Sequence, residues 1–219
     1  MHVHIVPFGV GLAVVNALAE TFEVRSDNGV CSWQKAYRAG LPVGSGTAPP
    51  SGSTGTRIIF EPPSGARPPD LAELRDHFVD QAHLHPGLRL SLNGEEFHGP
   101  QGLLGLALQA YTGDVQAAQT LWHRQEFDGF RLHVALVGEG AGTRTRSWVN
   151  GAETTSGGSH VEGLERALRA AGWTPELQFL SVVMDDPKFA GPTRAELAVP
   201  GMAGRVEKAM AAALRAQRK

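Results

Sequence analysis

The chain has 219 residues, which is enough for one large domain or two small ones. Apolar residues make up 42% of it, so a normal hydrophobic core can form, whereas a net charge of −2 excludes a general electrostatic attraction to nucleic acid or anionic membranes. Its single cysteine, Cys31, excludes an internal disulfide framework. No apolar run reaches the roughly 18 residues of a membrane span, and the first ten residues lack the basic flank and apolar stretch of a signal peptide. We therefore expect a soluble, cytoplasmic protein.

In the first half of the chain, alternating and helical patterns predict several strands and two helices. Apolar residues share one helical face over residues 11–19, and Asp70 is positioned to cap a helix over residues 71–84. Enrichment in Gly, Pro and Ser predicts a flexible loop over residues 40–55. The segments that alternate as strands do are residues 2–6, 21–25, 30–38, 56–60 and 88–92.

The second half predicts another mixture of strands and helices. Residues 120–127, 130–138 and 143–150 are predicted to be consecutive antiparallel strands, and residues 177–184 a buried strand. Helices are predicted over residues 99–111, 160–172 and from residue 202 to the end. Strands in runs with helices between them predict an α+β or α/β protein in two parts, which we divide into residues 1–95 and 96–219.

The stretch PFGVGLAVVNALAE, residues 7–20, opens a helix with a glycine-rich turn. Backbone N–H groups at a helix N-terminus are unpaired and attract anions, and glycine lets the backbone approach a ligand closely. Gly9, Val10, Gly11 and Leu12 are therefore candidates for cradling a phosphate. Taken alone, the two glycines could equally begin a helix that packs in a core.

Five strings occur in one order along the chain: FGVGLAVVNALAE, STGTRIIFEP, HPGLRLSL, VNGAETTSGGSHVEGLERAL and SVVMDDPKFAGPTRAEL. Together they resemble the B subunit of DNA gyrase and its relative, the ATPase subunit of topoisomerase IV, over nearly the whole chain. The resemblance implies the second half of a GHKL (Bergerat-type) ATPase sandwich in residues 1–95. It implies for residues 96–219 a transducer domain similar to the second domain of ribosomal protein S5.

The resemblance also implies residues that contact ATP. Residues 9–12 match the lid that closes over the triphosphate, Thr56 matches a threonine beside the adenine, and Arg194 matches a transducer lysine that reaches the γ-phosphate. Phe8 replaces the histidine of the lid, and Pro192-Thr193-Arg194 replaces a Gln-Thr-Lys stretch. On the residues alone, Thr56 is an ordinary strand residue and Arg194 an exposed loop cation.

The same resemblance implies that the catalytic and metal-binding residues of the family have no counterpart in this chain. In the family, a helix upstream of the lid carries the glutamate that activates water and the asparagine that holds Mg²⁺, and neither matches a residue of this chain. We therefore assign no catalytic and no metal-binding residue. We expect weakened ATP binding and no hydrolysis unless another chain supplies that segment and its Mg²⁺. Residues 1–95 are also expected to expose an apolar face.

Two hypotheses on function follow from this resemblance. In the first, the chain is a fragment of an ATP-dependent type IIA DNA topoisomerase that couples ATP binding to DNA strand passage. In the second, it is a stand-alone modulator or decoy that binds gyrase-type subunits or itself without catalysis. The last helix carries five basic residues, which suit either a solvated face or a weak contact with the DNA backbone: Arg205, Lys208, Arg215, Arg218 and Lys219.

Overall fold

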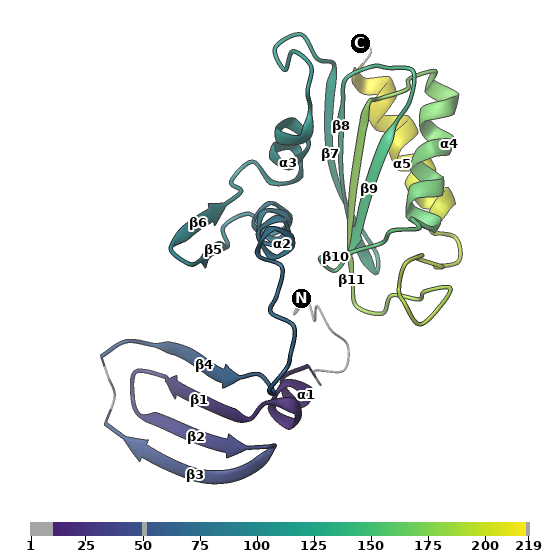
Figure 1. The fold of residues 1–219 in the computed structure, drawn as a ribbon. Coiled ribbons are helices and arrows are strands. Elements are labelled where there is room, and N and C mark those ends of the chain that lie inside the picture. The colour runs from purple at the N-terminus through teal and green to yellow at the C-terminus, as the bar shows by residue number, and fades with distance from the viewer. Residues whose placement is uncertain (1–10, 50–51, 218–219) are drawn as a thin grey trace. The chain divides into compact units, whose positions relative to one another are not determined.

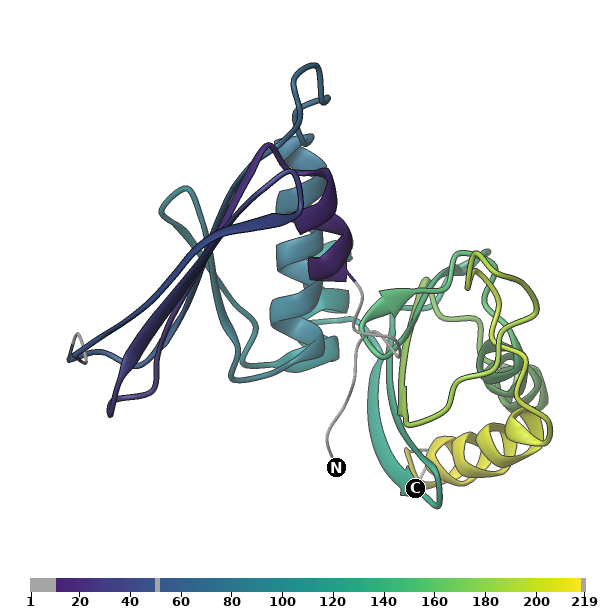
Figure 2. The same cartoon turned by 90° about the horizontal axis from the view of Figure 1, so that it is seen from below.

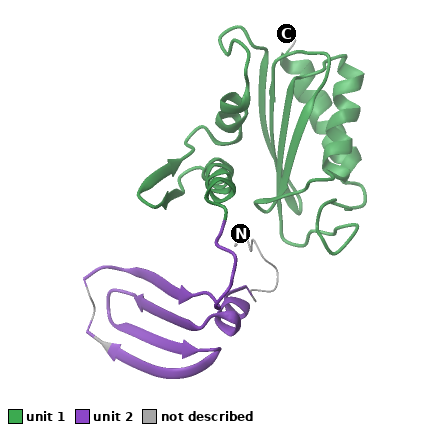
Figure 3. Cartoon of the chain, viewed as in Figure 1, with its two compact units in different colours: residues 1–5, 70–219 green, residues 6–69 purple. Residues whose placement is uncertain are grey.

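A computed structural model describes residues 11–49 and 52–217 of the chain. The chain divides into two compact units, one within residues 6–69 and the other within residues 70–219 (Figure 3). The order of the helices and strands can be followed in Figure 1. The strand predicted for residues 2–6 lies outside the described residues, as do Phe8, Gly9 and Val10.

The unit within residues 6–69 consists of one short helix and a four-stranded antiparallel sheet, whose twist is visible in Figure 2. The strand order is β3-β2-β1-β4, so β3 and β4 form the two edges of this sheet. The predicted hairpin is confirmed by the pairing of the first two strands. The elements are α1 (Gly11–Leu18), β1 (Thr21–Asp27), β2 (Ser32–Arg38), β3 (Leu41–Ala48) and β4 (Gly55–Glu61).

The loop predicted over residues 40–55 is wrong for half of its length, because Leu41–Ala48 forms the edge strand β3. Pro42 and two glycines give this segment the composition of a loop. Antiparallel pairing with β2 nevertheless orders it, and the register shifts between Ala36 and Tyr37, opposite Pro42. Proline is tolerated on edge strands and at bulges because its missing N–H need not join the ladder.

Few side chains of this unit are buried. Among its described residues, Ala19 and Phe22 are the ones in the buried class, and α1 buries none. Trp33, Ile58 and Phe60 are 42%, 38% and 52% exposed, although they share the face of the sheet on which Phe22 lies. The apolar exposure expected for the N-terminal part is therefore found on this sheet.

The unit within residues 70–219 contains a five-stranded sheet, a two-stranded hairpin and helices. Its first helix begins as predicted, because the Asp70 carboxylate accepts the backbone N–H groups of Ala72 at 2.8 Å and Glu73 at 3.3 Å. The elements are α2 (Leu71–Leu84), β5 (Arg89–Leu92), β6 (Glu95–His98), α3 (Gly102–Ala110), β7 (Thr120–Phe127), β8 (Phe130–Val137), β9 (Arg144–Val149), β10 (Ala152–Glu153), α4 (Ser159–Ala171), β11 (Leu177–Met184) and α5 (Met202–Gln217).

The five-stranded sheet has the order β10-β9-β11-β8-β7. The prediction of three consecutive antiparallel strands is wrong for β9, because β11 lies between β8 and β9. β11 runs antiparallel to β8 and parallel to β9, which the helical connection through α4 permits. Nearly every residue of β11 is buried, as expected for a continuous apolar run at the centre of a sheet covered on both faces.

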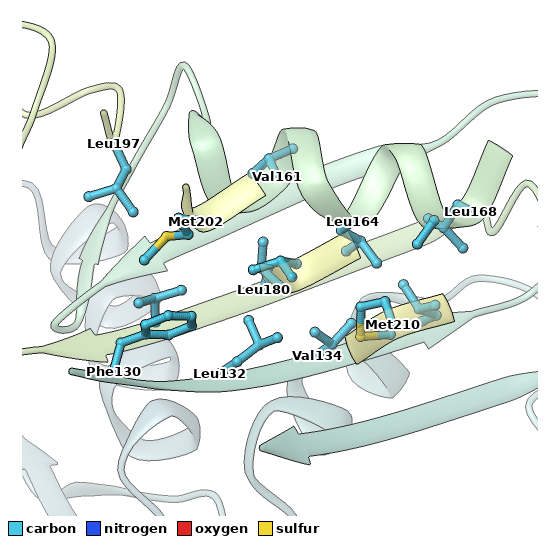
Figure 4. Close-up of a cluster of buried hydrophobic side chains, with 14 of the residues drawn as sticks. Phe130, Leu132, Val134, Val161, Leu164, Leu168, Leu180, Leu197, Met202 and Met210 are labelled. Carbon is cyan, nitrogen blue, oxygen red and sulfur yellow. The ribbon is translucent and has the colours of Figure 1, made fainter. Parts of the chain in front are cut away.

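One face of this sheet is covered by α4 and α5. Leu132, Val134 and Leu180 point from the strands toward Leu164 and Met210 on the helices (Figure 4). The two helices approach closely at Gly163, where a Cβ atom would lie 2.3 Å from the carbonyl oxygen of Ala203. A side chain there would force the helices apart, because close-packed interiors have no room to absorb it.

The opposite face is covered by α2 and α3 and contains the partly buried charge of Arg146. The Arg146 guanidinium bonds to both carboxylate oxygens of Asp80 on α2, at 3.0 and 2.6 Å, and to Glu153 on β10 at 2.9 Å. It also lies 4.6 Å from the ring centroid of Trp148. Burial by itself would lower the pKa of Arg146, but the hydrogen bonds and charges of Glu153 and Asp80 outweigh burial and raise it.

The compact units divide at residues 69 and 70, because α2 packs on α3, β5 and β6. Residues 70–95 therefore belong physically with the C-terminal unit. The boundary at residue 95 refers to the ATPase and transducer domains implied by the resemblance, and it stays a prediction.

Replacing Asp80 with alanine should destabilise the chain, because its side chain is 11% exposed and its removal leaves Arg146 with one carboxylate partner. We expect a loss of about 2 kcal/mol in the free energy of unfolding, typical of a hydrogen bond to a charged group. Urea denaturation would measure it. Asp76→Ala, on the exposed side of the same helix, should change stability by less than about 0.5 kcal/mol, and equal losses in the two variants would contradict the role of the pair.

His160 is fully buried at the start of α4. Its Nε2 lies 3.4 Å from the Thr154 hydroxyl, which is 2.6 Å from the Ser147 hydroxyl, and its Nδ1 has no hydrogen-bond partner among the described residues. Burial lowers the pKa of His160 from 6.5 to about 4. Burial, aided by the charges of Arg124 and Arg131, lowers the pKa of His133 to about 4 as well.

Stability should therefore fall as the pH drops from 6.5 toward 4. In this window the unfolded chain binds protons at these histidines and the folded chain does not, so acid favours unfolding. His160 alone accounts for up to about 3 kcal/mol of this loss. His160→Gln should make the pH dependence of the unfolding free energy less steep, whereas the exposed control His77→Gln should leave it unchanged. An NMR titration of His160 with a midpoint near 6.5 would contradict this assignment.

Candidate functional site

Two of the predicted lid residues lie at the first turn of α1. Gly11 and Leu12 are exposed, Leu12 to 55%, and a Cβ atom on Gly11 would meet no atom within 4 Å. Close packing therefore does not explain why residue 11 is a glycine. A glycine that begins a helix buried in a core would instead have atoms close to its Cα. The first backbone N–H groups of α1 point away from the helix without an intrahelical acceptor, as at any helix N-terminus.

Thr56 lies at the start of the edge strand β4 in the same unit. Its hydroxyl is 3.1 Å from the hydroxyl of Ser26 on the neighbouring strand β1. Both residues line a cavity of about 540 Å³ at this end of the sheet, together with Trp33, which shares their face of the sheet. An aromatic ring and two hydroxyls on one face can together receive a planar ligand.

Arg194 belongs to the other unit, on the loop between β11 and α5. It has a left-handed backbone with φ of 58°, and its N–H donates to the carbonyl of Gly191 at 3.3 Å, which closes a tight turn. Its guanidinium carbon lies 6.0 Å from the ring centroid of Phe189. Arg194 forms no ion pair within the described part of the chain, so its charge is available to an anion.

The loop that carries Arg194 is held by the glycines of the GGSH string. Leu197 N–H donates to Gly157 at 2.9 Å, and Ser159 N–H donates to Leu197 at 2.8 Å. A Cβ atom on Gly158 would lie 2.2 Å from the Leu197 carbonyl oxygen, so only glycine permits this approach. Sequence reasoning did not identify this role, because it depends on contact between two distant segments. Two adjacent glycines before a helix without a side-chain cap were the available signal.

Two of the basic residues of α5 already make contacts within the fold. Arg205 donates to the carbonyl of Asp128 at 2.7 Å and stacks over Phe130 at 4.6 Å, and Arg215 donates to the carbonyl of Ala211. Arg218 and Lys219 lie outside the described residues. The weak DNA contact suggested for this helix therefore stays a prediction, with Arg205 assigned instead to packing.

No group of three or more His, Cys, Asp or Glu side chains within residues 11–49 and 52–217 is arranged to hold a metal ion. No helix in the same ranges is long and apolar enough to cross a membrane.

Comparison with known proteins relates the chain to type IIA topoisomerase subunits. No protein-family model matches it. The B subunit of DNA topoisomerase 4 from Streptococcus pneumoniae is 30% identical over 175 residues, which are 73% of this chain and 27% of that protein. The B subunit of DNA gyrase from Myxococcus xanthus is 25% identical over 240 residues, which are 91% of this chain and 29% of that protein. The chain thus spans under a third of the length of these two relatives.

Solved structures show the same fold. The B-subunit of the DNA gyrase from Myxococcus xanthus matches with a TM-score of 0.78 at 23% identity, over 95% of this chain and 70% of that chain. The 43K ATPase domain of Thermus thermophilus gyrase B, solved with an aminocoumarin, matches with a TM-score of 0.73 at 22% identity, over 96% of this chain and 66% of that chain. These matches confirm the predicted α+β fold of a GHKL-type ATPase region. The chain is a homologue of one segment of the B subunits of DNA gyrase and topoisomerase IV.

Proposed function

We propose that the chain is the lid and transducer segment of a type IIA topoisomerase ATPase subunit, and that it couples ATP binding to DNA strand passage when completed by the rest of such a subunit. The observation that carries this proposal is colinear similarity over 91% of the chain to a gyrase B subunit. Residues 1–95 correspond in this proposal to the end of the ATPase domain and residues 96–219 to the transducer.

The candidate nucleotide contacts support a role in binding ATP. Residues 9–12 would receive the phosphates, Thr56 would lie beside the adenine, and Arg194 would reach the γ-phosphate. The exposure of Gly11 and the cavity beside Thr56 fit these roles. Arg194 can bind a phosphate through a fork of two N–H groups, which a lysine cannot.

The two glutamates that follow α1 are poor candidates for activating water. Glu20 and Glu23 are the acidic residues that follow α1. Glu20 accepts hydrogen bonds from the backbone and hydroxyl of Ser64, at 2.6 and 2.5 Å, and these bonds lower its pKa. Glu23 is paired with Arg25. Both carboxylates are thus occupied by their neighbours, so neither is a suitable base for hydrolysis.

ATP binding without turnover is the test of this proposal. Calorimetric titration with a non-hydrolysable ATP analogue should give micromolar binding, with Kd raised about tenfold by Arg194→Ala and about fivefold by Thr56→Val. Arg67→Ala, in an exposed loop, is the matched control and should not change Kd. The same preparations should release no phosphate from ATP. Absence of binding, or equal affinities in all variants, would contradict the proposed ATP site.

The exposed apolar side chains favour a second candidate, a modulator that binds gyrase-type subunits without catalysis. Trp33 is 42% exposed on the open face of the four-stranded sheet, where an aromatic side chain can anchor a partner.

The modulator hypothesis predicts that the full chain retains purified gyrase subunits in a pull-down. Trp33→Ser should lower the retained amount at least about tenfold, the effect of losing an aromatic anchor. Trp122→Ser, at a tryptophan on β7 that is 56% exposed, is the matched control. Failure of the unmodified chain to retain either subunit would count against this candidate.

A further inference from the structure

The backbone directly after Arg194 is hydrogen-bonded to the segment that precedes α4. The carbonyl of Ala195, the neighbour of Arg194, accepts the N–H of Ser156 at 2.8 Å. Two positions further along, the N–H of Leu197 donates to the carbonyl of Gly157 at 2.9 Å. We call the hydrogen bonds between residues 156–159 and 195–199 the clasp. The clasp begins one residue from Arg194, so the backbone position of Arg194 depends on it.

The same segment is bonded on its other side to the chain that enters the loop. Ala190 N–H donates to the carbonyl of Glu196 at 3.0 Å, and Ala198 N–H donates to the carbonyl of Lys188 at 2.7 Å. These bonds make a narrow hairpin whose tip is the turn that ends at Arg194. A two-stranded hairpin by itself is marginally stable in water. The clasp adds a third backbone segment to the hairpin and connects it to the start of α4.

Gly158 is the residue that permits the clasp. It has a φ of 124° and lies opposite Leu197 in a parallel bridge. A Cβ atom on Gly158 would lie 2.2 Å from the carbonyl oxygen of Leu197 and 2.4 Å from its nitrogen. These are the two backbone atoms of Leu197 that bond to Gly157 and Ser159. Any side chain at residue 158 would therefore push this backbone away and break both bonds.

Arg194 has a backbone conformation that favours glycine. Its φ of 58° lies in the left-handed region, where the Cβ atom of an L residue is crowded. Strain of this kind persists only where the surrounding structure enforces it, and it is typical of residues whose side chains have a function. The clasp and the hairpin supply that enforcement. No ion pair within the described ranges holds the guanidinium, so the fold fixes the backbone of Arg194 and leaves its charge for a ligand.

We propose that Gly158 is a positioning residue for recognition of a terminal phosphate, because the clasp that it permits holds Arg194 ready for the γ-phosphate and makes the chain prefer ATP to ADP. This role rests on the proposed function, in which Arg194 reaches the γ-phosphate. A side chain that is positioned before binding loses less conformational freedom when the ligand arrives, so the affinity is higher. ADP lacks the phosphate that Arg194 would contact, so its affinity should not depend on the clasp.

Calorimetric titration of the full chain with a non-hydrolysable ATP analogue and with ADP tests this role. The unmodified chain should bind the analogue at least about tenfold more tightly than ADP, the effect of a hydrogen bond to a charged group. Gly158→Ala should reduce this preference to about twofold and leave the Kd for ADP unchanged. The matched control is Gly172→Ala at the end of α4, another left-handed glycine, with φ of 64°, where a Cβ atom would meet no atom within 4 Å. It should keep the full preference.

A milder variant removes one bond of the clasp. The Ser159 hydroxyl accepts the N–H of Val199 at 3.2 Å, so Ser159→Ala should lower the preference for the ATP analogue about twofold. This variant serves as the test if Gly158→Ala does not fold. In both variants the Kd for ADP should stay at the value of the unmodified chain, which a general loss of structure would not allow.

Two further measurements separate positioning from a general structural effect. In an Arg194→Ala background, Gly158→Ala should change neither affinity, because the group that it positions is gone. Without nucleotide, the amide of Leu197 should exchange its hydrogen slowly in the unmodified chain and at least about tenfold faster in Gly158→Ala, since local opening exposes it.

The outcomes distinguish this role from the proposed function. A preference for the ATP analogue that survives both clasp variants, or an effect of Gly158→Ala that persists without Arg194, would overturn the role of Gly158 and leave ATP binding in place. Rapid exchange at Leu197 in the unmodified chain would overturn it as well. No binding of either nucleotide by the unmodified chain would contradict the proposed function itself, and the role of Gly158 with it.

Discussion

The partly buried guanidinium of Arg146 ties α2 to the five-stranded sheet. A charge that is partly removed from water is stabilised by pairing, and Arg146 is paired with one carboxylate on α2 and another on β10. Moving α2 away from the sheet would leave this charge half-neutralised, so the helix is held where it is. α3 and the hairpin of β5 and β6 pack on α2, so their positions depend on the same pair. Stacking on Trp148 restricts the guanidinium to one orientation.

The two sheets of the chain differ in how much apolar surface they bury. The five-stranded sheet has helices on both faces, and each large apolar side chain buried there contributes about 1.5–3 kcal/mol. The four-stranded sheet buries Ala19 and Phe22 among its described residues, so its stability rests largely on backbone hydrogen bonds and exposed cross-strand pairs. Such a sheet lies close to the margin of stability and gains from any ligand or partner that covers it.

Local signals predicted most of the elements correctly. The Asp70 cap, the hairpin of β1 and β2, and the helices α4 and α5 each follow from residues within a few positions of one another. The errors arose where distant segments decide the outcome. β3 is a strand only because β2 offers it an edge, and β11 enters between β8 and β9 through a crossover that no local pattern encodes.

The candidate site shows the same division between local and distant information. Residues 9–12 were selected by the glycine-rich turn at a helix start, a local signal. Thr56 and Arg194 were selected by the resemblance, since a threonine at a strand start and a loop arginine are ordinary by themselves. The role of Gly158 could not be predicted from the sequence, because it depends on contact with the backbone of Leu197, 39 positions later in the chain. A close approach of two backbone segments requires a glycine, which the sequence shows, but the sequence does not show which segment approaches that glycine.

Thr56 and Arg194 would respond to a nucleotide in different ways. Arg194 is on a loop whose backbone, at Leu197, exchanges hydrogen bonds with Gly157 and Ser159 of the GGSH string. The position of this loop is therefore set before any ligand arrives. Thr56 is on a strand that is exposed throughout and shares the sheet with little buried surface. Binding at Thr56 would cover exposed surface of β4, so a bound nucleotide would stabilise this strand and the sheet to which it belongs.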